Sequence, residues 1–185
     1  MNQDITFTQN PYKALPKVMT VKVKYWWLIV ISLLLRVLPY IFTETSSSVD
    51  LKRICLLLSY DILLFALVRN FHIKGVWVIA IGTLLNFIAI LANGSFMPVS
   101  PEARFLAAKT PIIMPVNGLS LTRAGGVILL PEQTKLRILT DIFPVSSIHT
   151  VFSIGDIVIG IGILVVCIEI ILQAVKRTAA SVPKQ

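Results

Sequence analysis

The sequence has little charge. Only 14% of its 185 residues are Asp, Glu, Lys or Arg, whereas about 25% of a typical globular domain is charged. Hydrophobic residues make up 56% of the chain. So few polar side chains cannot cover a water-soluble particle of this size. The composition therefore indicates a membrane protein and leaves no room for a separate soluble catalytic domain.

The sequence also lacks the short motifs of catalytic and metal sites, since it contains no HExxH, CxxC, Walker A or GxSxG pattern. Its two cysteines, Cys55 and Cys167, fall at opposite depths of the spans described below, so no disulfide is expected. We predict no cofactor and no metal, and the features lean against an enzyme. One alternative stays open, in which His149, Asp141 and Glu132 bind a divalent metal or act as acid and base.

A basic excess accompanies the low charge content, with a net charge of +8. The lysines and arginines mostly flank apolar runs, and no basic patch is interleaved with aromatic residues. We therefore interpret the excess as a signal for topology and lipid headgroups, and we expect no nucleic-acid partner. The first 24 residues contain no apolar run of signal-peptide length, so we expect the first span to act as a retained anchor.

Four apolar stretches are each long enough to cross a bilayer, which takes roughly 20 residues. The predicted spans are Tyr25–Phe42, Leu51–Val68, Val76–Ala92 and Val151–Ala174. They predict an all-α membrane protein built as a four-helix transmembrane bundle. In this scheme residues 25–175 form the membrane domain, and residues 1–24 and 176–185 are tails.

Charge and tryptophan placement predict the orientation of the bundle. Basic residues flank the first span, the turn between spans two and three, and the end of span four: Lys13, Lys17, Lys22, Lys24, Arg69, Lys74, Lys176 and Arg177. An even number of spans puts these clusters on one side, which the positive-inside rule makes the cytoplasm. Trp26, Trp27 and Trp77 open spans at that same interface. Both termini are therefore predicted to be cytoplasmic.

The longest connection, residues 93–150, is predicted to lie outside the membrane as an ordered, mostly irregular extracytoplasmic cap. Its many prolines and glycines exclude a long helix. The apolar runs PIIMP and GGVILLP are expected to form short strands or pieces that lie on the membrane. The segment EQTKLRILTDIF predicts a short helix, with Thr134 as a weak cap and Leu136, Leu139, Ile142 and Phe143 on one face.

Polar residues inside the spans are the main pointers to function, because a charge in hydrocarbon is costly. They are Arg36, Asp61, Asn86, Asn93 and Asp156. At 1.5 Å per residue, Arg36 and Asp156 lie about 9 Å and about 8 Å below the outer ends of their spans, and Asp61 lies roughly 15 Å deep. We predict a buried polar cluster in which Arg36 pairs with Asp156 beside Asn86, with Asp61 as a more distant partner.

Three blocks of the sequence, ANGSFMPVSPEA, GGVILLPEQTKLRILTDIFP and VFSIGDIVIGIGI, resemble an uncharacterised family of bacterial multi-pass membrane proteins. The resemblance covers roughly residues 25–175. It implies a bacterial origin, and with the spans it places the chain in the bacterial plasma (inner) membrane. The family has no established activity, so the resemblance implies none here.

The leading functional hypothesis is a non-enzymatic binding or accessory subunit, with the lipid bilayer and either a membrane protein or a second copy of the chain as partners. The polar cluster would bind a ligand or fix the register of the helices. A small oligomeric transporter or ion conductor that uses Arg36, Asp61 and Asp156 is the alternative. A membrane enzyme that modifies lipid headgroups under the cap comes third.

Overall fold

The computed structural model describes residues 22–42, 49–109 and 127–180. In chain order the elements are α1 (Trp26–Phe42), α2 (Val49–Val68), α3 (Lys74–Ala92), β1 (Pro98–Val99), α4 (Pro101–Ala108), β2 (Val127–Ile128), η3 (Pro131–Gln133), η4 (Arg137–Leu139), β3 (Phe143–Val145), η5 (Ser146–Ile148), β4 (Thr150–Phe152) and α5 (Ile154–Ala180). The η elements are single 3-10 turns. The described part of the chain is thus mostly helical.

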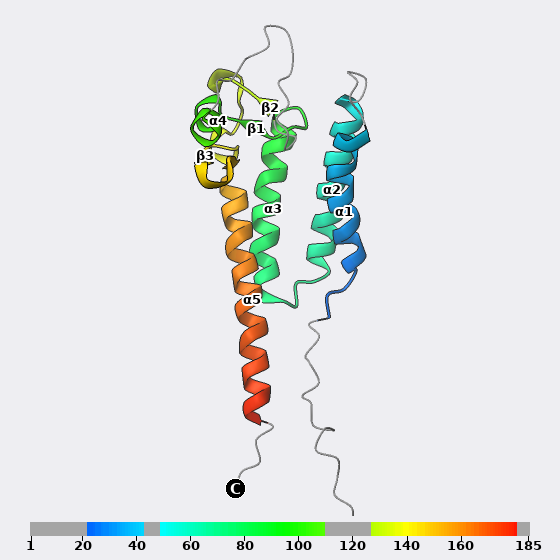
Figure 1. Ribbon diagram of the computed structural model, residues 1–185. Helices are drawn as coiled ribbons and strands as arrows, with labels where there is room; N and C mark the ends of the chain where they lie inside the picture. The colour runs from blue at the N-terminus through cyan, green and yellow to red at the C-terminus, as the bar shows by residue number, and fades with distance from the viewer. Residues whose placement is uncertain (1–21, 43–48, 110–126, 181–185) are drawn as a thin grey trace, which may run out of the picture.

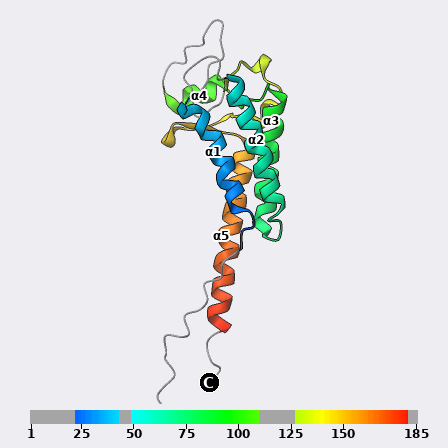
Figure 2. The ribbon, with the colours of Figure 1, turned by 90° about the vertical axis from the view of Figure 1, so that its right-hand side faces the viewer.

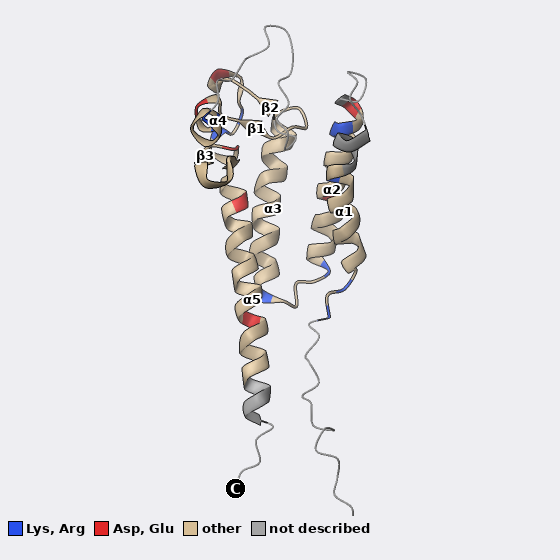
Figure 3. Cartoon of the chain, in the orientation of Figure 1, with Lys and Arg blue, Asp and Glu red and all other residues tan. Residues whose placement is uncertain are grey.

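The long helices run side by side as two pairs, with α1 against α2 and α3 against α5, and α2 packs on α3 (Figure 1). The short elements between α3 and α5 form the cap over one end of the α3–α5 pair, while α5 projects beyond the other end (Figures 1 and 2). Charged residues gather in the cap and near helix ends, and few lie along the helix bodies (Figure 3).

Two of the long helices, Lys74–Ala92 and the Ile154–Val175 part of α5, are long and apolar enough to cross a membrane. The other two predicted spans also form helices, α1 and α2, at nearly the predicted bounds. The apolar part of α1, Trp26–Val37, is shorter than the two helices that meet this criterion. By length and composition, the part of the chain that the structure describes therefore contains two candidate membrane-spanning helices.

The turn between α2 and α3 is held by Asn70, which is only 2% exposed. Its amide nitrogen donates to the carbonyl oxygens of Lys24 and Ala66, each at 2.7 Å, and its amide oxygen accepts from the Lys24 backbone nitrogen at 2.7 Å. Nearby, the rings of Phe71 and Trp77 stack with centroids 3.8 Å apart. These contacts tie the start of α1 to the hairpin.

Helices α3 and α5 approach closely because glycines face each other along their contact. A Cβ on Gly82 would lie 2.8 Å from the backbone nitrogen of Ile159, and one on Gly155 would lie 2.7 Å from the carbonyl oxygen of Gly82. Two turns away, a Cβ on Gly75 would lie 2.7 Å from the carbonyl oxygen of Gly162. Small residues at such positions let helix backbones meet, as they commonly do between membrane helices.

The cap is built from short paired segments. Strand β1 pairs in parallel with β2 and also forms a parallel bridge from Val99 to Asp141, while β3 and β4 form an antiparallel hairpin. Helix α4 begins at Pro101 after Ser100, whose side-chain oxygen accepts from the Ala103 nitrogen at 3.4 Å. Proline suits the first helical position because its missing N–H is not needed there.

The short helix predicted for EQTKLRILTDIF is wrong. The segment forms two separate 3-10 turns, η3 and η4, and then enters β3. Thr134 ends η3 rather than starting a helix, and its hydroxyl donates to the carbonyl oxygen of Leu130 at 2.9 Å. Leu136 has a φ of 52°, a left-handed conformation that breaks a right-handed helix. Of the two apolar runs, GGVILLP contributes strand β2, and PIIMP lies outside the described residues.

Candidate functional site

The start of α5, directly beneath the cap, is closed by a reciprocal pair of hydrogen bonds. The Asp156 backbone nitrogen donates to the hydroxyl oxygen of Ser153 at 3.0 Å, and the Ser153 backbone nitrogen donates to the Asp156 carboxylate at 3.0 Å. This is a capping box with Asp at the third helical position, which satisfies two N–H groups at the helix end. The carboxylate also lies where the positive end of the helix dipole favours it.

Asn86 extends this cap across to α3. Its amide nitrogen donates to the Asp156 carboxylate at 2.8 Å, and its amide oxygen accepts from the Ser153 hydroxyl at 2.8 Å. Asn86 is 3% exposed and Ser153 is fully buried. Every polar heavy atom of the three side chains therefore has a partner within the trio. We call Asn86, Ser153 and Asp156 the polar joint, because it fastens two helices.

Asp141 lies in the cap, close enough to Asp156 for the two carboxyl groups to interact electrostatically. Its backbone pairs with β1, since its nitrogen donates to the Pro98 carbonyl oxygen and its carbonyl oxygen accepts from the Ser100 nitrogen, both at 3.0 Å. Burial, with a smaller contribution from the negative charge of Asp156, raises the pKa of the Asp141 carboxyl to about 8. This carboxyl therefore carries a proton at neutral pH in the folded protein.

Arg36 is part of a stack that crosses three helices. Its guanidinium carbon lies 4.3 Å from the ring centroid of Tyr60, within the range of a cation–π interaction. The Tyr60 ring in turn stacks on Phe87, with centroids 5.6 Å apart and planes 12° apart. The Arg36 Nε is buried without a hydrogen-bond partner. Among the described residues no ion pair joins Arg36 to Asp156, so the structure places this arginine on Tyr60 instead.

The remaining two predicted site residues lie elsewhere. Asn93 joins the end of α3 to the cap, because its amide nitrogen donates to the carbonyl oxygens of Ala89 and Lys135 and its amide oxygen accepts from the Lys135 nitrogen, all at 2.8 Å. Asp61 is exposed on α2. The structure thus brings Asn86 and Asp156 together, and it does not bring Arg36, Asp61 or Asn93 into direct contact with that pair.

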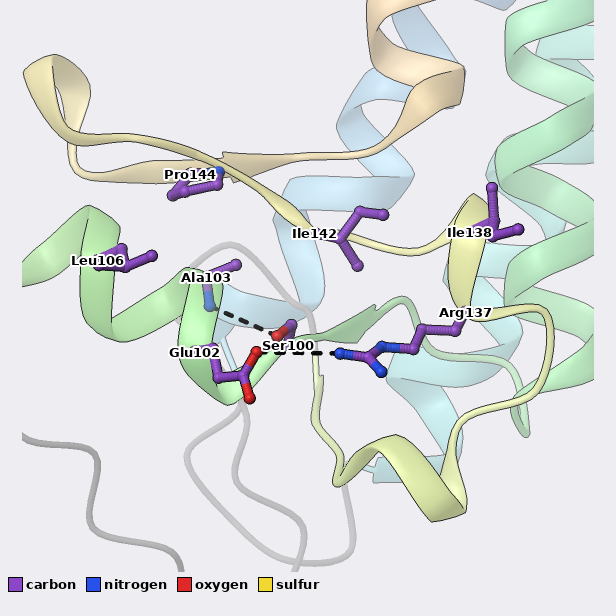
Figure 4. Close-up of a pocket in the computed structure, with 8 residues that line it drawn as sticks. All are labelled: Ser100, Glu102, Ala103, Leu106, Arg137, Ile138, Ile142 and Pro144. Atoms are coloured by element: carbon purple, nitrogen blue, oxygen red, sulfur yellow. Dashed lines mark hydrogen bonds and ion pairs between the residues drawn. The ribbon is translucent and has the colours of Figure 1, made fainter.

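The cap contains a hollow of about 300 Å³, about the smallest size usual for ligand pockets. It lies between α4 and the β3 region, as Figure 4 shows. Its lining residues are Ser100, Glu102, Ala103, Leu106, Arg137, Ile138, Ile142 and Pro144. Glu102 and Arg137 approach to 3.9 Å on one wall, with both side chains at least half exposed. The other walls are mainly apolar, so the hollow suits an apolar group.

The histidine and the two carboxylates that kept a metal or acid–base role open do not gather. In the part of the chain that the structure describes, no three His, Cys, Asp or Glu side chains are placed to hold a metal ion. His149 is exposed, and its Nδ1 lies 3.2 Å from the carbonyl oxygen of Ala107. Glu132 is exposed in η3.

Three features of this region escaped the sequence reasoning. Neither Tyr60 nor Asn70 was singled out, although the Arg36 guanidinium lies over the Tyr60 ring and Asn70 holds the turn between α2 and α3. The close approach of Gly155 to Gly82 was also missed. The spacing Ser153-x-x-Asp156 before an apolar run is a capping-box signature and could have located the polar joint from sequence.

The fold and the polar joint define a mostly helical protein. Its described residues contain two candidate membrane-spanning helices, which hydrogen bonds join beneath a small cap. The chain belongs to a family of unknown function, DUF5317, whose model matches residues 20–168. No curated protein and no solved structure matches the chain.

Proposed function

We propose that the protein is a non-enzymatic accessory subunit of a membrane complex, embedded through four spans, α1, α2, α3 and α5. The observation that carries this proposal is the exposure of α5. Only 6% of its apolar span is buried within the fold, against 44% for α3. A helix this apolar would be unstable against water, so its surroundings are lipid or another protein. Helices α1 and α2 lie beside this pair and add the other two spans.

The ends of the helices support one orientation. Trp26 and Trp27 at the start of α1, and Trp77 near the start of α3, are each about half exposed or more. Exposed indole rings at one end of a bundle are typical of a membrane interface. Arg69 and Lys74 lie at the same end, in the turn and at the start of α3. We infer that this end faces the cytoplasm of a bacterial cell, with both termini inside and the cap outside.

The state of the polar joint favours an accessory role over transport. A transporter needs polar groups that face a path for its substrate. Asn86, Ser153 and Asp156 instead use their polar atoms on one another. Large apolar side chains remain exposed along α1, α2 and α5, which offers wide surfaces for neighbouring helices. The polar joint would then hold the subunit's own helices in register while those surfaces bind the complex.

Native purification tests this proposal. The full chain is expressed at natural levels with a C-terminal tag, extracted in mild detergent, and its mass and composition are measured. We expect a second membrane protein to co-purify with the chain at a fixed stoichiometry. Recovery of the chain alone as a monomer would overturn the accessory role. A reporter at the C-terminus, active only in the cytoplasm, tests the orientation separately.

A further inference from the structure

One face of α2 carries large apolar side chains that the described chain leaves uncovered. Leu51, Ile54, Leu58, Phe65 and Val68 are each about half exposed. These positions recur every three or four residues, so they line one side of the helix. Asp61 falls into the same series, three residues after Leu58 and four before Phe65, and its side chain is exposed as well. We call this surface the Asp61 face.

Asp61 lies inside α2, 12 residues after Val49 and seven before Val68, at the level of the half of α3 nearer the cap. The preceding residue, Tyr60, is 6% exposed and stacks on Phe87, which fixes this part of α2 against α3. Phe87 is 13 positions after Lys74 and five before Ala92, the two ends of α3. If α3 crosses the membrane, as the proposed function requires, Asp61 points away from the bundle at a depth where water is scarce.

The carboxyl group of Asp61 has no partner among the described residues. The ion pairs there join Arg53 to Asp50 and Arg137 to Glu102. A carboxylate that faces hydrocarbon is costly, and such residues usually pair with an opposite charge. The apolar residues above and below Asp61 would cover the pair and keep water away from it.

The described helices of a second copy do not supply this charge. Arg36 is the only Lys or Arg in the middle of α1, α2, α3 or α5, because the others in these helices lie near an end. Arg36 is already placed over the ring of Tyr60. Two copies that met through the Asp61 face would set two carboxylates near each other. A different protein is therefore the source that we infer for the cation.

We propose that the Asp61 face docks a transmembrane helix of another membrane protein that carries a Lys or Arg in the middle of its apolar span. The basic side chain pairs with Asp61, and the flanking apolar side chains pack on Leu58 and Phe65. This inference rests on the proposed membrane-embedded role and names the chemistry of the partner.

Defined peptides test the charge requirement. The full chain, with an acceptor dye on a C-terminal tag, is reconstituted in phosphatidylcholine vesicles with donor-labelled polyleucine transmembrane peptides that carry Lys, Leu or Glu at the centre. Association is measured by energy transfer. We expect the Lys peptide to bind about ten-fold more tightly than the Leu peptide, the size of effect seen for polar contacts between model membrane helices. The Glu peptide should show no such gain.

Variants locate the effect. Asp61→Asn should remove the preference for Lys, while Asp50→Asn, a change of the same kind at the outer end of the same helix, should keep it. Asp61→Lys should reverse the preference, so that the Glu peptide binds best. Equal binding of the Lys and Leu peptides to the unchanged chain, or an unchanged preference in Asp61→Asn, would overturn the proposal. Self-association that Asp61→Asn abolishes would overturn it too, since a second copy would then be the occupant.

The failure of this inference can be told apart from the failure of the proposed function. If native purification recovers a stoichiometric complex and Asp61→Asn retains it, the accessory role stands and the Asp61 contact is wrong. If the unchanged chain is recovered alone as a monomer, the accessory role fails whatever the peptides show.

Discussion

The side-chain amide of Asn86 on α3 donates a hydrogen bond of 2.8 Å to the carboxylate of Asp156 on α5. This contact links two residues 70 positions apart in the sequence. It joins the helix that leads into the cap to the helix that leaves it. Ser153 completes the arrangement, because its hydroxyl donates to Asn86 and accepts from the Asp156 backbone. The cap therefore rests on a base whose two helices are fixed to each other.

Removal of the Asn86 amide is expected to loosen this base. Asn86→Ala leaves the Ser153 hydroxyl and one Asp156 oxygen without their partner on α3. An unsatisfied buried polar group costs about 1–3 kcal/mol. Thermal unfolding of the purified chain in detergent should show a lower midpoint. Gln173→Ala is the control, because its amide bonds within α5, and it should leave the midpoint nearly unchanged.

Two glycines of α5 are expected to respond in opposite ways to the same substitution. A Cβ on Gly155 would overlap the Asn86 amide and crowd Gly82, while one on Gly160 would meet nothing within 4 Å. Gly155→Ala should therefore destabilise the fold by about 1–3 kcal/mol, the usual cost of overpacking. Gly160→Ala should be neutral or stabilising by up to about 1 kcal/mol, because alanine favours helix more than glycine does. Equal midpoints for the two variants would contradict the close approach of α3 and α5.

The four long helices could be predicted from sequence because each rests on a local signal, an apolar run of sufficient length. Just after α3, Gly94 has a φ of 70°, the left-handed conformation that glycine commonly adopts after a helix C-terminus. The pairing of the helices carried no such signal. Depth arithmetic gave the height of Arg36 but not its direction, and α1 packs on α2, so Arg36 meets Tyr60 rather than Asp156.

The small residues of α5 illustrate the same limit. Ser153, Asp156 and Gly160 have helical spacing, but Ser153 precedes the first residue of α5 and folds back on the helix end. The face that meets α3 is instead marked by Gly155 and Gly162. In the cap, tertiary hydrogen bonds override the helical pattern of EQTKLRILTDIF. The Asn93 side chain binds both the backbone nitrogen and the carbonyl oxygen of Lys135. Such contacts depend on residues distant in sequence.

Asn70 is expected to control access to the start of α1. Asn70→Ala removes the three hydrogen bonds that hold Lys24 and the end of α2. Trypsin should then cleave after Lys24 faster than in the unchanged chain, since local opening precedes cleavage. His72→Ala is a suitable control, because His72 is exposed and its contact to the Lys22 carbonyl oxygen is long, at 3.3 Å. Equal cleavage rates in Asn70→Ala and the unchanged chain would show that other contacts hold this segment.

Asp141 is expected to make the fold less stable as pH rises. Burial raises its pKa to about 8 in the folded protein, against an ordinary value of 3.8, so the folded state holds a proton that the unfolded chain has released. The resulting stabilisation is fully present below about pH 4, and it is lost progressively up to about pH 8. Thermal midpoints measured between pH 5 and pH 9 should fall with pH and level off above about pH 8. Asp141→Asn, which stays neutral, should flatten the profile, whereas Asp50→Asn, a change at an exposed carboxylate, should keep it. A slope that Asp141→Asn leaves intact would assign the titration to another group.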